Sequence, residues 1–204
     1  MNAPLFPVPF GLYLVITNPV VGYARCTEAA VRAGVSFVQL RMKHATRKEI
    51  VKEGLAMRSV TAGTKTRLII NDDPSIAVEV GADGVHLGQS DMPIQEARAK
   101  YPELKIFGLS THNFAQAQAA DALKPDYIGI GPIYTTPTKE IPDPTVGIEE
   151  AGRILASVKV PALAIGGLNK ENLPLLRAVG FKNYAVVRAV CQSEDPYSRI
   201  RELM

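Results

Sequence analysis

Residues 67–87 read RLIINDDPSIAVEVGADGVHL. The stretch opens with a β-branched run, Arg67 to Asn71, and closes with a second apolar run, Gly84 to Leu87. Between the two runs, Asp73 stands before a proline as a helix N-cap would, and Gly81 stands where a glycine commonly ends a helix. Parallel strands need a crossover connection, and this one has room for a single helix. The stretch therefore predicts a strand–helix–strand unit.

The same unit recurs along the chain. The segments between the predicted strands read as helices, for instance 46–61, 113–124 and 148–158. Eight such units in about 200 residues are typical of a closed single-domain (β/α)8 TIM barrel, which we expect to span residues 1–204. An open doubly wound sheet is the competing architecture, but a glycine-rich turn does not follow the first run. The predicted strands are 12–17, 37–41, 67–71, 84–87, 105–109, 127–130, 162–165 and 183–187.

Composition excludes several classes of protein. The chain has 204 residues, of which 47% are hydrophobic and 21% are charged, a profile typical of a globular domain. A net charge of +3 is too small to favour nucleic acid or an anionic membrane as a partner. Cys26 and Cys191 lack the spacing of a zinc site or a disulfide framework and are expected to be reduced thiols. The apolar run near the N-terminus is too short to span a bilayer, so we expect a cytoplasmic protein.

In barrels, chemistry takes place in the loops after the strands. At the end of the second predicted strand, the alternation of side chains places Gln39, Arg41 and Lys43 on the inner face, with apolar neighbours on the side that meets the helices. Charges buried there need a counter-charge. A bound anion or an internal carboxylate would serve, and both interpretations remain open.

Two carboxylates follow neighbouring strands. Asp72 comes after the third strand, and Asp91 comes after the fourth. Adjacent strands lie about 4.8 Å apart, so both side chains could reach one hard cation such as Mg2+ if phosphate supplied further oxygens. Asp91 could instead cap the helix that follows it.

Further polar residues follow the later strands. The long loop 131–147 carries hydroxyl groups beside Lys139, which suit anionic oxygens. Gly167 and Arg188 follow the seventh and eighth strands, where barrels commonly bind a phosphate. Two anion sites are thus expected. Among the histidines, His86 is interpreted as a hydrogen-bonded core residue, and His112 is placed for proton transfer at the barrel mouth.

Six segments near successive strand ends carry polar and glycine residues: Gln39 to Lys43, Asn71-Asp72, Gly84 to Asp91, Ser110 to His112, Gly129 to Lys139 and Ala164 to Gly167. Taken together and in this order, they resemble the thiamine-phosphate synthase family. The family joins a hydroxymethylpyrimidine pyrophosphate to a thiazole phosphate and releases pyrophosphate. Its fold is a TIM barrel, its cofactor is Mg2+, and its partners are these small molecules and a second copy in a homodimer.

The resemblance implies a role for each matching residue. Asp72 and Asp91 would bind Mg2+, and Arg41, Lys43, Ser110 and Lys139 would form the catalytic set. The pyrimidine pyrophosphate would be bound by Gln39, Leu40, Arg41, Met42, Lys43, Asn71, Ser110 and Lys139. The thiazole phosphate would be bound by Thr136, Pro137, Thr138, Gly167, Val187 and Arg188.

The chain departs from the family pattern at three places. Asn18 replaces an aspartate, residues 180–183 replace a glycine-rich turn, and Arg188 stands where the family typically has serine. Arg188 could reinforce the phosphate site or pair with Glu194 or Asp195. Two other functions stay open. A thiazole tautomerase on a related barrel would use a histidine such as His112, and a non-catalytic metabolite-binding regulator would use the anion sites alone.

Overall fold

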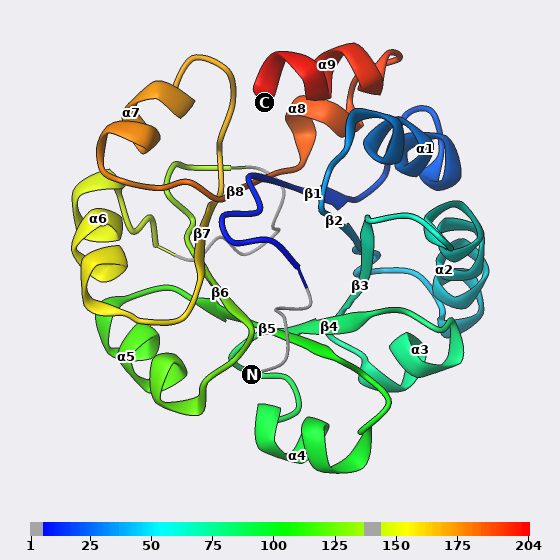
Figure 1. Ribbon diagram of the computed structural model, residues 1–204, viewed down its shortest axis with the longest axis horizontal. Helices are drawn as coiled ribbons and strands as arrows, with labels where there is room; N and C mark the ends of the chain where they lie inside the picture. The colour runs from blue at the N-terminus through cyan, green and yellow to red at the C-terminus, as the bar shows by residue number, and fades with distance from the viewer. Residues whose placement is uncertain (1–5, 137–143) are drawn as a thin grey trace.

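The computed structural model describes residues 6–136 and 144–204. All eight strands run parallel and close into a barrel in chain order, with β1 paired to both β2 and β8 (Figure 1). This closure confirms the predicted TIM barrel and excludes the open sheet. The strands are β1 (Leu12–Ile16), β2 (Phe37–Leu40), β3 (Arg67–Asn71), β4 (Gly84–Leu87), β5 (Ile106–Thr111), β6 (Tyr127–Ile130), β7 (Ala162–Ile165) and β8 (Tyr184–Val186).

Helices follow the strands and surround the barrel (Figure 1). Predicted caps are confirmed at three helices: the side chains of Thr46, Asp73 and Asn113 each accept hydrogen bonds from backbone N–H groups of the first turn. Gly34 ends the first helix with a φ of 80°. The helices are α1 (Tyr23–Ala33), α2 (Arg47–Thr61), α3 (Pro74–Glu79), α4 (Ile94–Lys100), α5 (Phe114–Leu123), α6 (Ile148–Ser157), α7 (Leu173–Ala178), α8 (Arg188–Cys191) and α9 (Pro196–Leu203).

Apolar side chains form two clusters, one on each face of the sheet. The outward face of each strand packs against the helices, with Val38 and Leu40 of β2 as examples. The inward face fills the barrel with a smaller cluster that contains Tyr13, Phe37 and Tyr127. Successive residues of a strand point to opposite faces, so every strand except β4 contributes to both clusters.

The N-terminal segment closes one end of the barrel. Phe6 and Phe10 belong to the inner cluster, and the Phe10 ring lies within 6.5 Å of the ring centres of Phe6, Tyr13, Phe37 and Tyr127. The segment crosses the middle of the barrel in Figure 1. The Asn183 side chain accepts a hydrogen bond of 2.8 Å from the Phe10 N–H and anchors this plug to the sheet. The cavity of the barrel is therefore accessible from the opposite end, where the strands finish.

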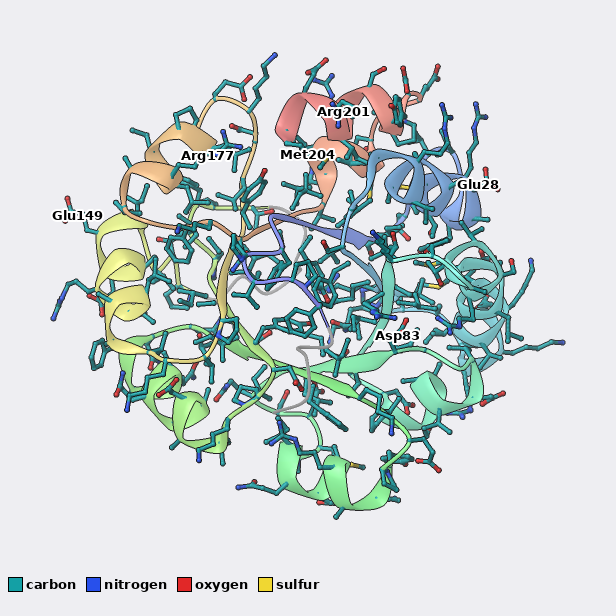
Figure 2. All side chains as sticks on the ribbon, viewed as in Figure 1. Glu28, Asp83, Glu149, Arg177, Arg201 and Met204 are labelled. Atoms are coloured by element: carbon teal, nitrogen blue, oxygen red, sulfur yellow. The ribbon has the colours of Figure 1, made fainter. Side chains whose placement is uncertain are left out.

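Charged residues occupy the outside of the helix ring, as Glu28, Glu149 and Arg201 show in Figure 2. In the described part of the chain, every helix is too short or too polar to cross a membrane. One boundary differs from the prediction in a way that affects the site. The eighth strand stops at Val186, so Val187 and Arg188 belong to the start of α8 and not to the strand.

Candidate active site

A cavity of about 660 Å³ opens at the carboxyl ends of the strands. Such a volume is in the range of small-molecule sites. The predicted site residues that line it come from seven of the eight strand ends. They are Gln39, Arg41, Lys43, Asn71, Asp72, Asp91, Ser110, Thr136, Gly167, Val187 and Arg188.

The two cations after β2 have different partners. Lys43 forms an ion pair with Asp72, so the internal carboxylate accounts for this lysine. Arg41 is half-buried, and within the described ranges its guanidinium makes no hydrogen bond or ion pair. Burial lowers the pKa of Arg41, and the negative charge of Asp72 partly offsets this. The arginine therefore carries the unmatched positive charge that a bound anion would neutralise.

Leu40 and Met42 do not line the cavity with their side chains. Leu40 is buried in the outer cluster, and Met42 packs against the same cluster. The period of two along β2 turns these residues toward the helices whenever Gln39 and Arg41 face inward. Any contact that they make with a substrate is through the backbone.

Asp72 and Asp91 lie side by side, as their neighbouring strand ends predict. Burial and the nearby Asp91 carboxylate raise the pKa of Asp72, and the hydrogen bond from Lys43 partly opposes this rise. The Asp91 carboxylate accepts a hydrogen bond of 2.6 Å from the Gly88 N–H. Helix α4 has Pro93 as its N-cap with no side-chain cap, so the capping interpretation of Asp91 is wrong.

This pair is suited to a hard divalent cation. Two carboxylates that repel each other gain stability when a cation lies between them, and oxygen donors are the ligands that Mg2+ prefers. In residues 6–136 and 144–204, no cluster of three or more acidic, histidine or cysteine residues is arranged as a metal site. Two protein ligands would leave most of the six positions around Mg2+ to water and substrate oxygens, the usual arrangement where the metal binds with a phosphate.

Glycines bring the loops after β6 and β7 into close contact. A Cβ atom on Gly166 would lie 2.5 Å from Pro132, and one on Gly167 would lie 2.7 Å from Tyr134. Both glycines also have positive φ values, 104° and 68°. Thr136 and Gly167 both line the cavity. The predicted site residues Pro137, Thr138 and Lys139 lie outside the described residues.

Arg188 is exposed and lines the cavity as the first residue of α8. Asp195, one of its two alternative partners, caps α9 by accepting a hydrogen bond from the Ser198 N–H. In the part of the chain that the structure describes, Arg188 pairs with neither Glu194 nor Asp195. Its chain neighbours Val187 and Ala189 line the cavity as well.

Among the cavity residues that were not predicted as site residues, three are joined to predicted ones by hydrogen bonds. Tyr13 and Tyr127 were not singled out, and His86 was interpreted only as a core residue. All three lie at inward positions of their strands, and this periodicity would have identified them. They join Gln39 to Ser110 through a line of hydrogen bonds, which we call the barrel hydrogen-bond chain.

The barrel hydrogen-bond chain has four contacts. The Gln39 amide donates to the Tyr13 hydroxyl over 2.9 Å, and the Tyr13 and Tyr127 hydroxyls are 2.8 Å apart. The Tyr127 hydroxyl lies 3.1 Å from Nδ1 of His86, whose Nε2 lies 2.8 Å from Oγ of Ser110. Burial raises the pKa of both tyrosines, so each keeps its hydroxyl proton.

His112 lies at the cavity, as expected for a residue at the barrel mouth. Its Nδ1 is 2.6 Å from the Gly131 carbonyl oxygen, which can only accept a hydrogen bond. Nδ1 is therefore protonated. The backbone N–H of His112 donates to the side chain of Gln116, so both the ring and the main chain are held in place.

Comparison with known proteins agrees with this arrangement. Residues 12–190 match the family model described as thiamine monophosphate synthase. The chain belongs to this family. Membership places it among the transferases of thiamine biosynthesis, the class of enzyme that the resemblance predicted.

Curated relatives of this family differ in length. A thiamine-phosphate synthase from Vibrio campbellii is 41% identical over 92% of this chain and 93% of the relative. One from Prochlorococcus marinus is also 41% identical, over 86% of this chain and 50% of the relative. The chain thus spans about half the length of some curated family members and almost all of others.

Solved structures support the fold. A thiamine phosphate pyrophosphorylase from Pyrococcus furiosus superposes with a TM-score of 0.86 at 31% identity, covering 95% of this chain and 93% of the other. A 3-hexulose-6-phosphate synthase from Salmonella typhimurium superposes with a TM-score of 0.72 at 15% identity, covering 95% and 96%. The second similarity concerns the barrel alone.

Proposed function

We propose that this protein is a thiamine-phosphate synthase that condenses hydroxymethylpyrimidine pyrophosphate with thiazole phosphate. The supporting observation is that one cavity combines cationic residues after β2, an acidic pair after β3 and β4, and glycines and an arginine after β7 and β8. A transferase that holds two anionic substrates and releases pyrophosphate needs all three.

The residues after β2 suit the departing group. In the proposed reaction the pyrimidine becomes a cationic methylene species as pyrophosphate leaves, and the thiazole nitrogen then attacks. Arg41 and Lys43 carry fixed positive charge toward the oxygens that gain negative charge, so no protein nucleophile is needed. Removal of one such cation typically costs roughly 3 kcal/mol, or about a hundredfold in rate. Lys139 would add a third cation to this set.

Asp72 and Asp91 would hold Mg2+, which would supply further positive charge beside the pyrophosphate. Asn71, the last residue of β3, lines the same wall and would bind the pyrimidine substrate together with Gln39 and Ser110. Asp72 has a φ of 69°, a conformation uncommon for residues with a side chain, and it turns its carboxylate toward Asp91 at this strand end.

The far side of the cavity suits the thiazole phosphate. Gly167 lines the cavity with no side chain of its own, and the first N–H groups of α8 lie beyond the reach of intrahelical acceptors. Thr136 and Arg188 line the same region, and Pro137 and Thr138 would complete it. The family resemblance also implies a homodimer, which light scattering of the purified protein would test.

One assay separates the candidate functions. The purified protein is incubated with both substrates and Mg2+, and thiamine phosphate and pyrophosphate are quantified. Formation of both products in equal amounts would establish the synthase. Conversion of the thiazole alone, without a pyrimidine substrate, would instead support the tautomerase, with His112 and its fixed ring as the proton carrier. Binding without turnover of either kind would support the regulator.

A further inference from the structure

The barrel hydrogen-bond chain has a direction that its buried residues determine. The Gln39 amide nitrogen can only donate, so the Tyr13 oxygen accepts from it. Tyr13 is 1% exposed, and among the described residues its hydroxyl has Tyr127 as its other hydrogen-bond partner. The Tyr13 proton therefore points to Tyr127, because a buried hydroxyl proton without an acceptor is unfavourable.

The direction continues to the other end. Tyr127 is fully buried, accepts from Tyr13, and has its own proton left for Nδ1 of His86. A neutral imidazole that accepts at Nδ1 carries its proton on Nε2. The Nε2–H group then donates to Oγ of Ser110, which lies 2.8 Å away. Ser110, having accepted this bond, keeps its own hydroxyl proton for another partner.

We infer that the barrel hydrogen-bond chain holds Ser110 as a hydrogen-bond donor toward the cavity, with Tyr13, Tyr127 and His86 as positioning residues. This inference rests on the proposed function, in which Ser110 contacts the pyrimidine. A pyrimidine ring nitrogen accepts hydrogen bonds, whereas an exocyclic amino group mainly donates them. Ser110 in this state selects a ring nitrogen, and the reversed chain would select a donor group. The direction of the Ser110 hydroxyl, and with it this substrate contact, is thus determined by the other residues of the barrel hydrogen-bond chain.

The tautomer of His86 is the first readout, and it requires no substrate. Nitrogen-15 spectra of the imidazole rings are recorded in mildly alkaline buffer, and the His86 signals are assigned by their loss in His86→Gln. We expect the Nε2–H tautomer in the unmodified protein and a mixture of tautomers in Tyr127→Phe, in which Nδ1 has lost its donor. The Nδ1–H tautomer in the unmodified protein, or the same spectrum in Tyr127→Phe, would overturn the inference.

Tyr184→Phe is the matched control for Tyr127→Phe. Tyr184 is also buried, and its hydroxyl donates a hydrogen bond of 2.7 Å to the Leu203 carbonyl, outside the barrel interior. Each variant removes one buried hydroxyl, so both should lose similar stability. Only Tyr127→Phe should change the His86 tautomer.

Steady-state kinetics provide the second readout. Tyr127→Phe should raise KM for the pyrimidine pyrophosphate about fivefold, the effect of redirecting one hydrogen bond, and leave KM for the thiazole phosphate unchanged. In a Ser110→Ala background the same substitution should add nothing, because it acts through Ser110. Additive effects in the double variant, or an equal effect of Tyr184→Phe, would remove the positioning role.

The two readouts separate this inference from the proposed function. An unmodified protein that makes no thiamine phosphate would refute the synthase, and the His86 spectra would still decide the direction of the chain. A working synthase whose His86 carries its proton on Nδ1 would refute the inference alone.

Discussion

Asp72 is a residue whose local environment favours function over stability. Burial and Asp91 raise its pKa, which means that the ionised carboxylate is disfavoured in the folded protein relative to the unfolded chain. Its φ of 69° is also better tolerated by asparagine. Asp72→Asn should therefore retain or raise the melting temperature of the metal-free protein. Both Asp72→Asn and Asp91→Ala should abolish Mg2+-dependent turnover. Calorimetry measures the melting temperature, and the synthase assay measures turnover. Full activity of either variant in EDTA would refute the metal assignment.

Arg188 is the residue at which the chain departs most from its family pattern. It lines the cavity, and among the described residues it forms no ion pair with Glu194 or Asp195. A guanidinium adds a charged, bidentate contact to a phosphate that a serine hydroxyl cannot match. Arg188→Ser should raise KM for thiazole phosphate by roughly 10-fold or more, corresponding to about 1.5 to 3 kcal/mol, with KM for the pyrimidine substrate little changed. An equal or lower KM in the variant would show that the arginine is a bystander or an obstruction.

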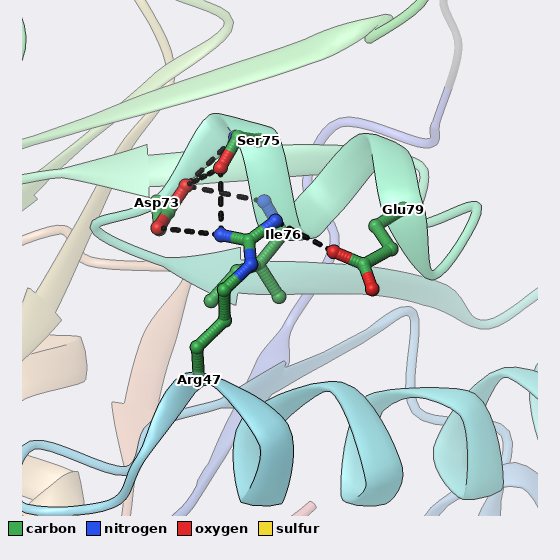
Figure 3. A network of polar contacts seen from close by, with 5 residues as sticks. All are labelled: Arg47, Asp73, Ser75, Ile76 and Glu79. Carbon is green, nitrogen blue, oxygen red and sulfur yellow. Dashed lines mark hydrogen bonds and ion pairs between the residues drawn. The ribbon is translucent and has the colours of Figure 1, made fainter.

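At the scale of elements, α2 is tied to α3 next to the acidic strand ends. Arg47, the first residue of α2, donates to Asp73, Ser75 and Glu79 of the α3 region over 3.4, 2.9 and 2.6 Å (Figure 3). Isolated surface ion pairs contribute little to stability, but a guanidinium shared by several acceptors contributes more. The network also holds the N-terminus of α3 directly after Asp72.

Arg47→Ala should lower the free energy of unfolding by about 1 kcal/mol, and Arg153→Ala by roughly half of that or less. Arg153 is the control because it forms an exposed pair with Glu150 on its own helix, α6, and has no such contact with a second element in residues 6–136 and 144–204. Urea denaturation of the two variants measures both values. Equal losses would mean that the α2–α3 link adds nothing beyond an ordinary surface ion pair.

At the scale of the whole molecule, the barrel is closed at one end by aromatic packing and open at the other for chemistry. Phe10 is 6% exposed and packs against four rings, whereas Phe114 on α5 is 39% exposed. Phe10→Ala should therefore cost about 3 to 5 kcal/mol of stability, and Phe114→Ala should cost well under that amount. Denaturant unfolding compares the two. A loss in Phe10→Ala no larger than in the control would show that the N-terminal plug is not part of the cooperative core.

Local sequence patterns predicted much of the architecture. Strands β3, β4, β6 and β7 begin and end where the apolar runs predicted, and Thr46, Asp73 and Asn113 cap their helices. The prediction was less accurate at β8, where the apolar run continues past the last paired residue, Val186, into α8. Apolar residues at that point serve a strand and a short helix equally well, so their pattern alone does not distinguish the two.

The sequence by itself determined the barrel, the two faces of each strand and the gathering of Arg41, Asp72, Asp91 and Ser110 at one end. These follow from periodicity and chain order, which are local properties. Only the tertiary structure decided which partner each polar group takes: Lys43 rather than Arg41 pairs with Asp72, Asp91 binds Gly88 rather than a helix end, and His86 connects Tyr127 to Ser110. The physical reason is that a hydrogen bond depends on distances of a few tenths of an ångström between residues far apart in the chain, and these distances are established only when the barrel closes.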